Sequence, residues 1–171
     1  MKIGSAWLWL LACGCATVGD EPRVLDDACK VAPDGADAAV EAALNAFHRA
    51  AAEADEDTYF ALLPDDAVFL GTDPAERWTG REFREFAMPY FRRDSAWIYE
   101  PRDRFLTVDP ARGFAWFDEM LDNKAYGVCR GSGVMEYRNG AWVIRQYNLS
   151  IPVPNDLAAD LAARIRAMAK K

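Results

Sequence analysis

His48 is the only histidine in the chain, and together with Asp118 it forms the pair of residues best suited to proton transfer. It lies four residues after Leu44, at the flank of an apolar stripe with helical spacing. An imidazole beside a carboxylate such as Asp118 is a general acid–base unit. A lone histidine is also a common packing residue, and Asp118 could instead form an ion pair with Arg102 or Arg104.

Polar side chains are also expected on the last two strands. Asn139-Gly140 predicts a two-residue type I′ hairpin, because both central residues of that turn need positive φ. The turn fixes the register and puts Trp142 on the apolar, inward face. Gln146 and Asn148 then follow on this face, beside two glycines that suggest curvature or space. Both could equally satisfy buried backbone groups.

The loop around residues 122–125 decides which residues of the preceding strand join that face. A loop of even length puts Trp116 and Asp118 inside, whereas an odd loop puts Phe117 and Glu119 there. We adopt the even loop, with His48 close enough to share a ligand or a water, although Trp116 could simply be a core residue. The predicted pocket residues on the sheet are Trp116, Asp118, Cys129, Gln146 and Asn148.

No motif for a metal, a nucleotide or a covalent intermediate is present. One histidine and no paired cysteine spacing argue against a zinc site. The sequence has no Walker loop, dinucleotide glycine fingerprint or nucleophile elbow. The net charge of -7 offers no electrostatic footprint for nucleic acid or anionic lipid. We therefore expect no metal, no cofactor and no nucleic acid, and a small molecule as the partner.

The elements that position these residues are helices first and strands last. Asp37 can cap a first helix that carries Val40, Leu44 and Phe47 on one side. A second helix is expected over 56–63, and Thr79 to Glu82 form a capping box that opens a third. Strands are predicted at 67–71, 96–108, 114–121, 126–137 and 141–150, with a final helix from residue 155. This order predicts an α+β domain.

The first fifteen residues have the features of an export signal. Lys2 is followed by an apolar run over 6–12, too short for the roughly 20 residues that span a bilayer. The run ends in Leu10-Leu11-Ala12-Cys13, which resembles the bacterial lipobox, in which the cysteine is lipidated. Cys15 is the alternative acceptor, and a short buried segment is the alternative reading.

A tether is expected to follow the signal. Residues 1–13 would be the signal peptide, 14–36 a flexible tether and 37–171 the domain. The protein would then lie in the bacterial cell envelope, held to a membrane only through lipid, with its domain in the periplasm or outside the cell. Lipidation of Cys13 would leave three cysteines, so a Cys29–Cys129 disulfide is open but not established by sequence.

Three stretches resemble the SnoaL-like domains of the nuclear-transport-factor-2-like superfamily. They are residues 54–69, 78–83 and 142–150, and the resemblance covers roughly residues 38–150. It implies a cone-shaped fold in which N-terminal helices pack in a strongly curved antiparallel sheet, here followed by a C-terminal helix. The fold hosts enzymes, binding modules and assembly domains, so it does not fix the function.

The ketosteroid isomerase pattern of this superfamily is not matched. Its base position falls near Gly71, with only Asp73 close by, and its tyrosine position falls on Phe47. The leading interpretation is a domain that binds a small, partly apolar molecule. The alternatives are an isomerase, cyclase or hydratase that uses His48 and Asp118, or an assembly module. The assembly module would form a homodimer through the convex sheet, at Arg130, Glu136, Arg145 and Tyr147.

Overall fold

The computed structural model of the chain describes residue 32 and residues 34–168. The predicted lipidation site Cys13, its alternative Cys15, and Cys29 lie outside the described residues, as does most of the predicted tether. No helix within the described part is both long enough and apolar enough to cross a membrane.

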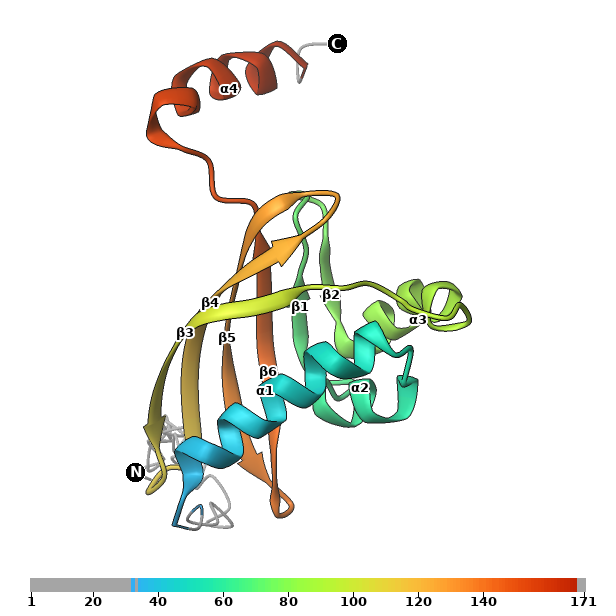
Figure 1. Cartoon of the computed structure of the whole chain (residues 1–171), viewed down its shortest axis with the longest axis vertical. Coiled ribbons are helices and arrows are strands. Elements are labelled where there is room, and N and C mark those ends of the chain that lie inside the picture. The colour runs from blue at the N-terminus through green and yellow to red at the C-terminus, as the bar shows by residue number, and fades with distance from the viewer. Residues whose placement is uncertain (1–31, 33, 169–171) are drawn as a thin grey trace, which may run out of the picture.

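The domain has the predicted α+β class, with helices first and a meander of strands after them (Figure 1). The first helix begins at Ala36, one residue before the predicted cap Asp37, because Gly35 takes the N-cap position with a φ of 82°. The elements are α1 (Ala36–Ala52), α2 (Glu56–Leu62), β1 (Val68–Leu70), β2 (Arg77–Thr79), α3 (Gly80–Phe91), β3 (Glu100–Asp109), β4 (Phe114–Asn123), β5 (Gly127–Arg138), β6 (Ala141–Ser150) and α4 (Asn155–Met168).

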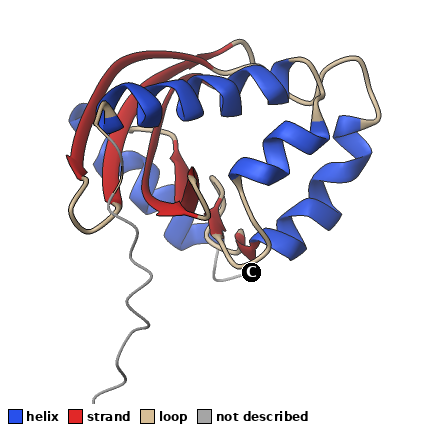
Figure 2. Ribbon diagram, turned by 90° about the horizontal axis from the view of Figure 1, so that it is seen from below, coloured by secondary structure: helices blue, strands red, loops and turns tan. Residues whose placement is uncertain are grey.

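The six strands form one sheet in the order β2-β1-β6-β5-β4-β3. All neighbours are antiparallel except β1 and β6, which run parallel, so the sheet is wider than the four-stranded meander alone. The sheet curves around α1, and α1 packs against β3 and β6 while α2 packs against β6 (Figures 1 and 2). This concave side holds the core.

Local sequence signals explain the helices around the core. The stripe of Val40, Leu44 and Phe47 on α1 is buried, as its spacing predicts. At the start of α3 the Thr79 backbone N–H donates to Glu82 Oε2 over 2.8 Å, and the Glu82 N–H donates to Thr79 Oγ1 over 3.3 Å. Both bonds of the predicted capping box are therefore present.

The β5–β6 hairpin confirms the turn and corrects the register beyond it. Asn139 and Gly140 have φ values of 55° and 87°, as a type I′ turn requires. Pairing follows the prediction as far as Met135 opposite Ile144, but Val134 then faces Gln146. The intervening Arg145 is the extra residue of a β-bulge. One extra residue exchanges the two faces of the strand, because the side chains alternate with a period of two.

The β4–β5 connection also differs from the prediction. Asn123 pairs with Gly127, so the loop has three residues, 124–126, and is odd rather than even. The Asn123 side chain accepts the N–H groups of Ala125 and Tyr126, both over 2.9 Å, and Gly127 has a φ of 72°. A three-residue loop followed directly by a left-handed glycine is a common hairpin form. It turns Phe117 and Glu119 inward and Trp116 and Asp118 outward.

The C-terminal helix α4 stands apart from the domain (Figure 1). None of its residues is buried. Its apolar residues have the predicted helical spacing, and the most exposed are Leu157, Ile165 and Met168.

Candidate functional site

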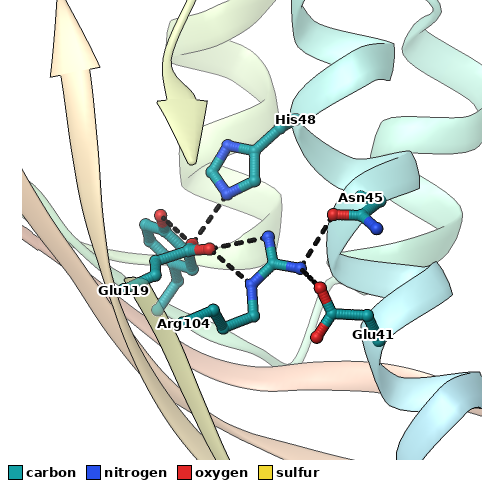
Figure 3. A network of polar contacts seen from close by, with 6 residues as sticks. Glu41, Asn45, His48, Arg104 and Glu119 are labelled. Carbon is teal, nitrogen blue, oxygen red and sulfur yellow. Dashed lines mark hydrogen bonds and ion pairs between the residues drawn. The ribbon is translucent and has the colours of Figure 1, made fainter. Parts of the chain in front are cut away.

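A buried histidine–glutamate pair lies where α1 crosses the sheet. His48 Nε2 is 2.7 Å from Oε1 of Glu119 on β4, and the two side chains point toward one another (Figure 3). Glu119 has no exposed surface and His48 is 8% exposed. Glu119 and not Asp118 meets His48, because the odd loop after β4 sets which residues face inward.

Every oxygen of the Glu119 carboxylate is occupied. Oε1 accepts hydrogen bonds from His48 and from the Tyr147 hydroxyl, the latter over 3.2 Å. Oε2 accepts from Arg104 Nε over 2.8 Å, and Arg104 Nη2 lies 2.7 Å from it. Burial by itself raises the pKa of Glu119, but the hydrogen bond from His48, the charge of the His48 ring when it is protonated, and the charge of Arg104 outweigh it, so the pKa lies below its usual value. The carboxylate is therefore ionised, and it holds its neighbours rather than a ligand.

Arg104 connects this pair to α1. Its Nη1 donates to Glu41 Oε1 over 2.6 Å and to Asn45 Oδ1 over 2.8 Å (Figure 3). Glu41, Asn45 and His48 are four and three residues apart, so they share one side of the helix. Arg104 reaches inward because the pairing of β3 with β4 is interrupted between Arg102 and Phe105. Two residues there face one on β4, as in a β-bulge.

Gly131 makes room for this network. A Cβ atom at this position would lie 2.3 Å from the Tyr147 hydroxyl and 2.9 Å from Glu119 Oε1. Glycines on this strand were expected to leave space for something close. At Gly131 the close groups are these two side chains of the protein itself.

A cavity of about 250 Å³ opens beside the pair, and eleven of its seventeen lining residues are aromatic. Its buried aromatic side chains are Phe47, Tyr59, Phe69, Phe83 and Tyr147. Half-buried or exposed aromatic side chains complete it at Trp78, Phe86, Tyr90, Trp97, Tyr99 and Tyr126. His48 lines this cavity, whereas Glu119 and Arg104 lie behind it.

The second ring nitrogen of His48 has no partner in the described part of the chain. Nε2 is bonded to Glu119, and Nδ1 has no hydrogen-bond partner among residues 34–168. It is also not one of the fully enclosed polar atoms. Because the ionised Glu119 accepts the proton of Nε2, the neutral ring has its lone pair on Nδ1.

Residues 40–154 match the family model of the SnoaL-like domain. The chain belongs to the SnoaL-like family. No curated protein matches the sequence. Among solved structures, an NTF2-like protein of unknown function from Pseudomonas putida KT2440 has a TM-score of 0.61 at 11% identity, covering 73% of this chain and 92% of that chain.

Two further structures show the same fold. A protein of unknown function from the DUF3225 family of Pectobacterium atrosepticum has a TM-score of 0.57 at 20% identity, over 68% of this chain and 90% of its own. An NTF-2 like protein of unknown function from Shewanella oneidensis MR-1 has a TM-score of 0.57 at 12% identity, over 67% and 98%. Similarity at these identities concerns the fold alone.

In this SnoaL-like domain His48 lies beside the cavity, as expected. The predicted sheet residues do not line it. Trp116 is 52% exposed, and Asp118 is exposed beside it on the outer face of β4. Gln146 is exposed and Asn148 is half-buried, opposite Ser132 on the outer face. The inward prediction for these four residues is wrong, because the odd loop and the bulge at Arg145 each exchange the two faces.

Cys129 is inward and buried, as predicted, but it does not line the cavity. Burial raises the pKa of its thiol. It pairs along the sheet with Leu121.

The residues that do meet His48 were not in the predicted pocket. The sequence predicts an inward Glu119 only if the loop is odd, and it suggests Arg104 only as an ion-pair partner of Asp118. Tyr147 was expected on the convex face, but it is 2% exposed and lines the cavity. Asn123 and Gly127, which bracket the three-residue loop, are the sequence signal that favours Glu119.

Proposed function

We propose that this SnoaL-like domain is an acid–base enzyme that binds a small, largely apolar molecule in its aromatic cavity and transfers a proton with His48. The observation that supports this most directly is the geometry of the ring. One nitrogen of His48 is fixed by the buried carboxylate of Glu119, the other has no hydrogen-bond partner among the described residues, and His48 lines the cavity. A base that is oriented by a third group is the usual arrangement for proton transfer.

The proposed step begins with neutral His48. Its Nδ1 lone pair takes a proton from an acidic C–H of the ligand, and the ligand keeps the electron pair as an enolate or similar anion. The ionised Glu119 then stabilises the positive charge on the ring. Return of the proton to another atom of the ligand gives an isomer. Return of the proton to a leaving hydroxyl gives water and an unsaturated product.

Glu119 is a positioning residue in this proposal. It has no exposed surface, and its two oxygens are held by His48, Tyr147 and Arg104. It therefore acts through His48, whose tautomer and orientation it fixes. The aromatic walls supply apolar burial for the ligand.

The test is exchange of hydrogen for deuterium in a panel of cyclic ketones and enones dissolved in D₂O, followed by NMR. The chain should accelerate exchange of protons next to the carbonyl of at least one compound. His48→Ala should lower that rate by roughly 10²–10⁴-fold. Asp118→Asn is the matched control, because this exposed carboxylate is adjacent to Glu119 in sequence. Ligand binding without exchange in any compound would favour a binding domain without catalysis.

We also propose a second role, pairing of two copies through the outer face of the sheet. Phe105 is 67% exposed and Trp116 is 52% exposed on the neighbouring strands β3 and β4. Large exposed aromatic side chains that lie together mark interaction sites. Sedimentation should show a dimer whose dissociation constant rises in Trp116→Glu and not in Glu85→Gln, which changes an exposed charge on α3 away from this face. A monomer at all concentrations would contradict this role.

We propose, from the sequence alone, that the domain is exported and attached to the bacterial envelope through lipid on Cys13. The support is the Leu10-Leu11-Ala12-Cys13 motif at the end of a short apolar run. The ligand would then be one that is present outside the cytoplasm.

A further inference from the structure

One carboxylate lines the aromatic cavity. Among the described residues that line it, Glu76 is the one carboxylate, and none is a lysine or arginine. Arg104 is the basic group of the His48 network, and it lies behind Glu119 and is bonded there and to Glu41.

Glu76 is held at the cavity by its own loop. This loop joins β1 to β2, and the Asp73 N–H donates to Glu76 Oε2 over 3.0 Å. The Gly71 N–H donates to the Glu76 carbonyl over 2.9 Å. A Cβ atom at position 71 would lie 2.2 Å from Glu76 Oε2, so the loop leaves space at Gly71 for this carboxylate. Contacts within this loop therefore hold Glu76 at the cavity.

Tyrosines lie near this carboxylate. Tyr99 and Tyr126 line the cavity together with Glu76. Burial raises the pKa of Tyr99 to about 12, and Cys129, Tyr126 and Glu76 add to the effect. Tyr99 thus remains an uncharged phenol, whose ring has a negative face.

We infer that the cavity selects a ligand with a positive charge on an apolar body, such as an amine or a quaternary ammonium compound. The faces of aromatic rings attract cations within about 6 Å, most strongly where water is excluded. Glu76 adds a full negative charge to this attraction. An anionic ligand would meet the same carboxylate, with His48 as the one basic side chain of the described lining and its Nε2 already bonded to Glu119. This inference rests on the proposed function, because it takes the same cavity as the ligand site.

The experiment is calorimetric titration of the full chain with two probes of the same shape. The probes are para-hydroxyphenyltrimethylammonium and its uncharged isostere para-tert-butylphenol, at one fixed pH. Because the probes differ in charge and hardly in size, the ratio of their affinities measures the preference for a cation. We expect the cation to bind on the order of tenfold more tightly.

Two variants locate the source of the preference. Glu76→Gln keeps an oxygen that can accept from the Asp73 N–H, and it should weaken binding of the cation roughly threefold or more without changing that of the phenol. Glu85→Gln removes the same charge from an exposed position on α3 that does not line the cavity, and it should leave both affinities unchanged. Equal losses in the two variants would show a long-range effect and overturn the role of Glu76.

The remaining outcomes separate this inference from the proposed function. If the phenol binds as tightly as the cation, the preference for charge is wrong, while the cavity still binds small molecules. If neither probe binds the wild-type chain, the inference is overturned. The proton-transfer proposal then stands or falls on the exchange measurement with His48→Ala, which uses uncharged ketones.

Discussion

His48 Nε2 lies 2.7 Å from Glu119 Oε1, and this contact joins the helix that begins the domain to β4, the strand next to the β3 edge of the sheet. Two further side chains, Tyr147 and Arg104, are hydrogen-bonded to the same carboxylate. Arg104 in turn donates to Glu41. Glu119 is thus both a structural centre and the group that orients His48. Its substitution should affect stability and activity together.

Glu119→Gln should destabilise the domain by roughly 1–3 kcal/mol, because the amide cannot satisfy all the donors that surround it. Urea unfolding at neutral pH measures the change. Asp118→Asn should change the free energy of unfolding by less than about 0.5 kcal/mol, since its side chain is exposed. A larger loss in Asp118→Asn than in Glu119→Gln would mean that the face of β4 is assigned wrongly.

Between neutral and acid pH, the wild-type chain should lose more of its free energy of unfolding than Glu119→Gln loses. The pKa of Glu119 is lowered in the folded state from its usual 4.5. The contribution of Glu119 to the free energy of unfolding is therefore complete above its pKa in the unfolded state. This contribution is lost as the pH falls through its pKa in the folded state. Unfolding free energies measured over a pH series should show a shallower acid slope in the variant. Identical slopes would contradict an ionised Glu119.

Gly131→Ala should destabilise the domain by about 1–3 kcal/mol, because its Cβ would overlap the Tyr147 hydroxyl. Removal of that hydroxyl in Tyr147→Phe should relieve part of the overlap. The double variant should therefore be more stable than the sum of the single changes predicts, by at least about 0.5 kcal/mol. Thermal and urea unfolding measure this coupling. Ser132→Ala, on the opposite face of β5, is the control, and strict additivity would argue against the close approach.

Gly140→Val should cost on the order of 1–2 kcal/mol, because a β-branched residue resists the φ of 87° found there. Gly140→Asn should cost less, since asparagine tolerates the left-handed region. Denaturation midpoints compare the two. Equal midpoints for both variants would be inconsistent with the type I′ turn.

Labelled palmitate should enter the protein in bacteria, and Cys13→Ser should abolish the labelling. The reason is that the lipobox-like motif ends at this residue. Gel fluorography of the purified chain measures it. Label that persists in Cys13→Ser and disappears in Cys15→Ser would move the site, and a wild-type chain without label would refute lipidation.

The sequence by itself determined the parts of this protein that depend on local chemistry. The Asn139-Gly140 turn, the Thr79–Glu82 capping box and the apolar stripe of α1 each follow from a few adjacent residues. So does the order of helices and strands that makes the domain α+β and places His48 beside the core. The stretches that resemble the SnoaL-like family lie in the same elements, and they predicted its cone-shaped fold.

Only the tertiary structure decided which side chains meet His48. Side chains on a strand alternate, so one residue more or less in a loop or a bulge exchanges the two faces. The three-residue loop before Gly127 turns Glu119 inward in place of Asp118. The bulge at Arg145 turns Tyr147 inward in place of Gln146 and Asn148. The bulge in β3 likewise turned Arg104 inward. The loop has a local signal in Asn123 and Gly127, whereas no pattern of adjacent residues marks the two bulges, which appear only in the pairing of one strand with the next.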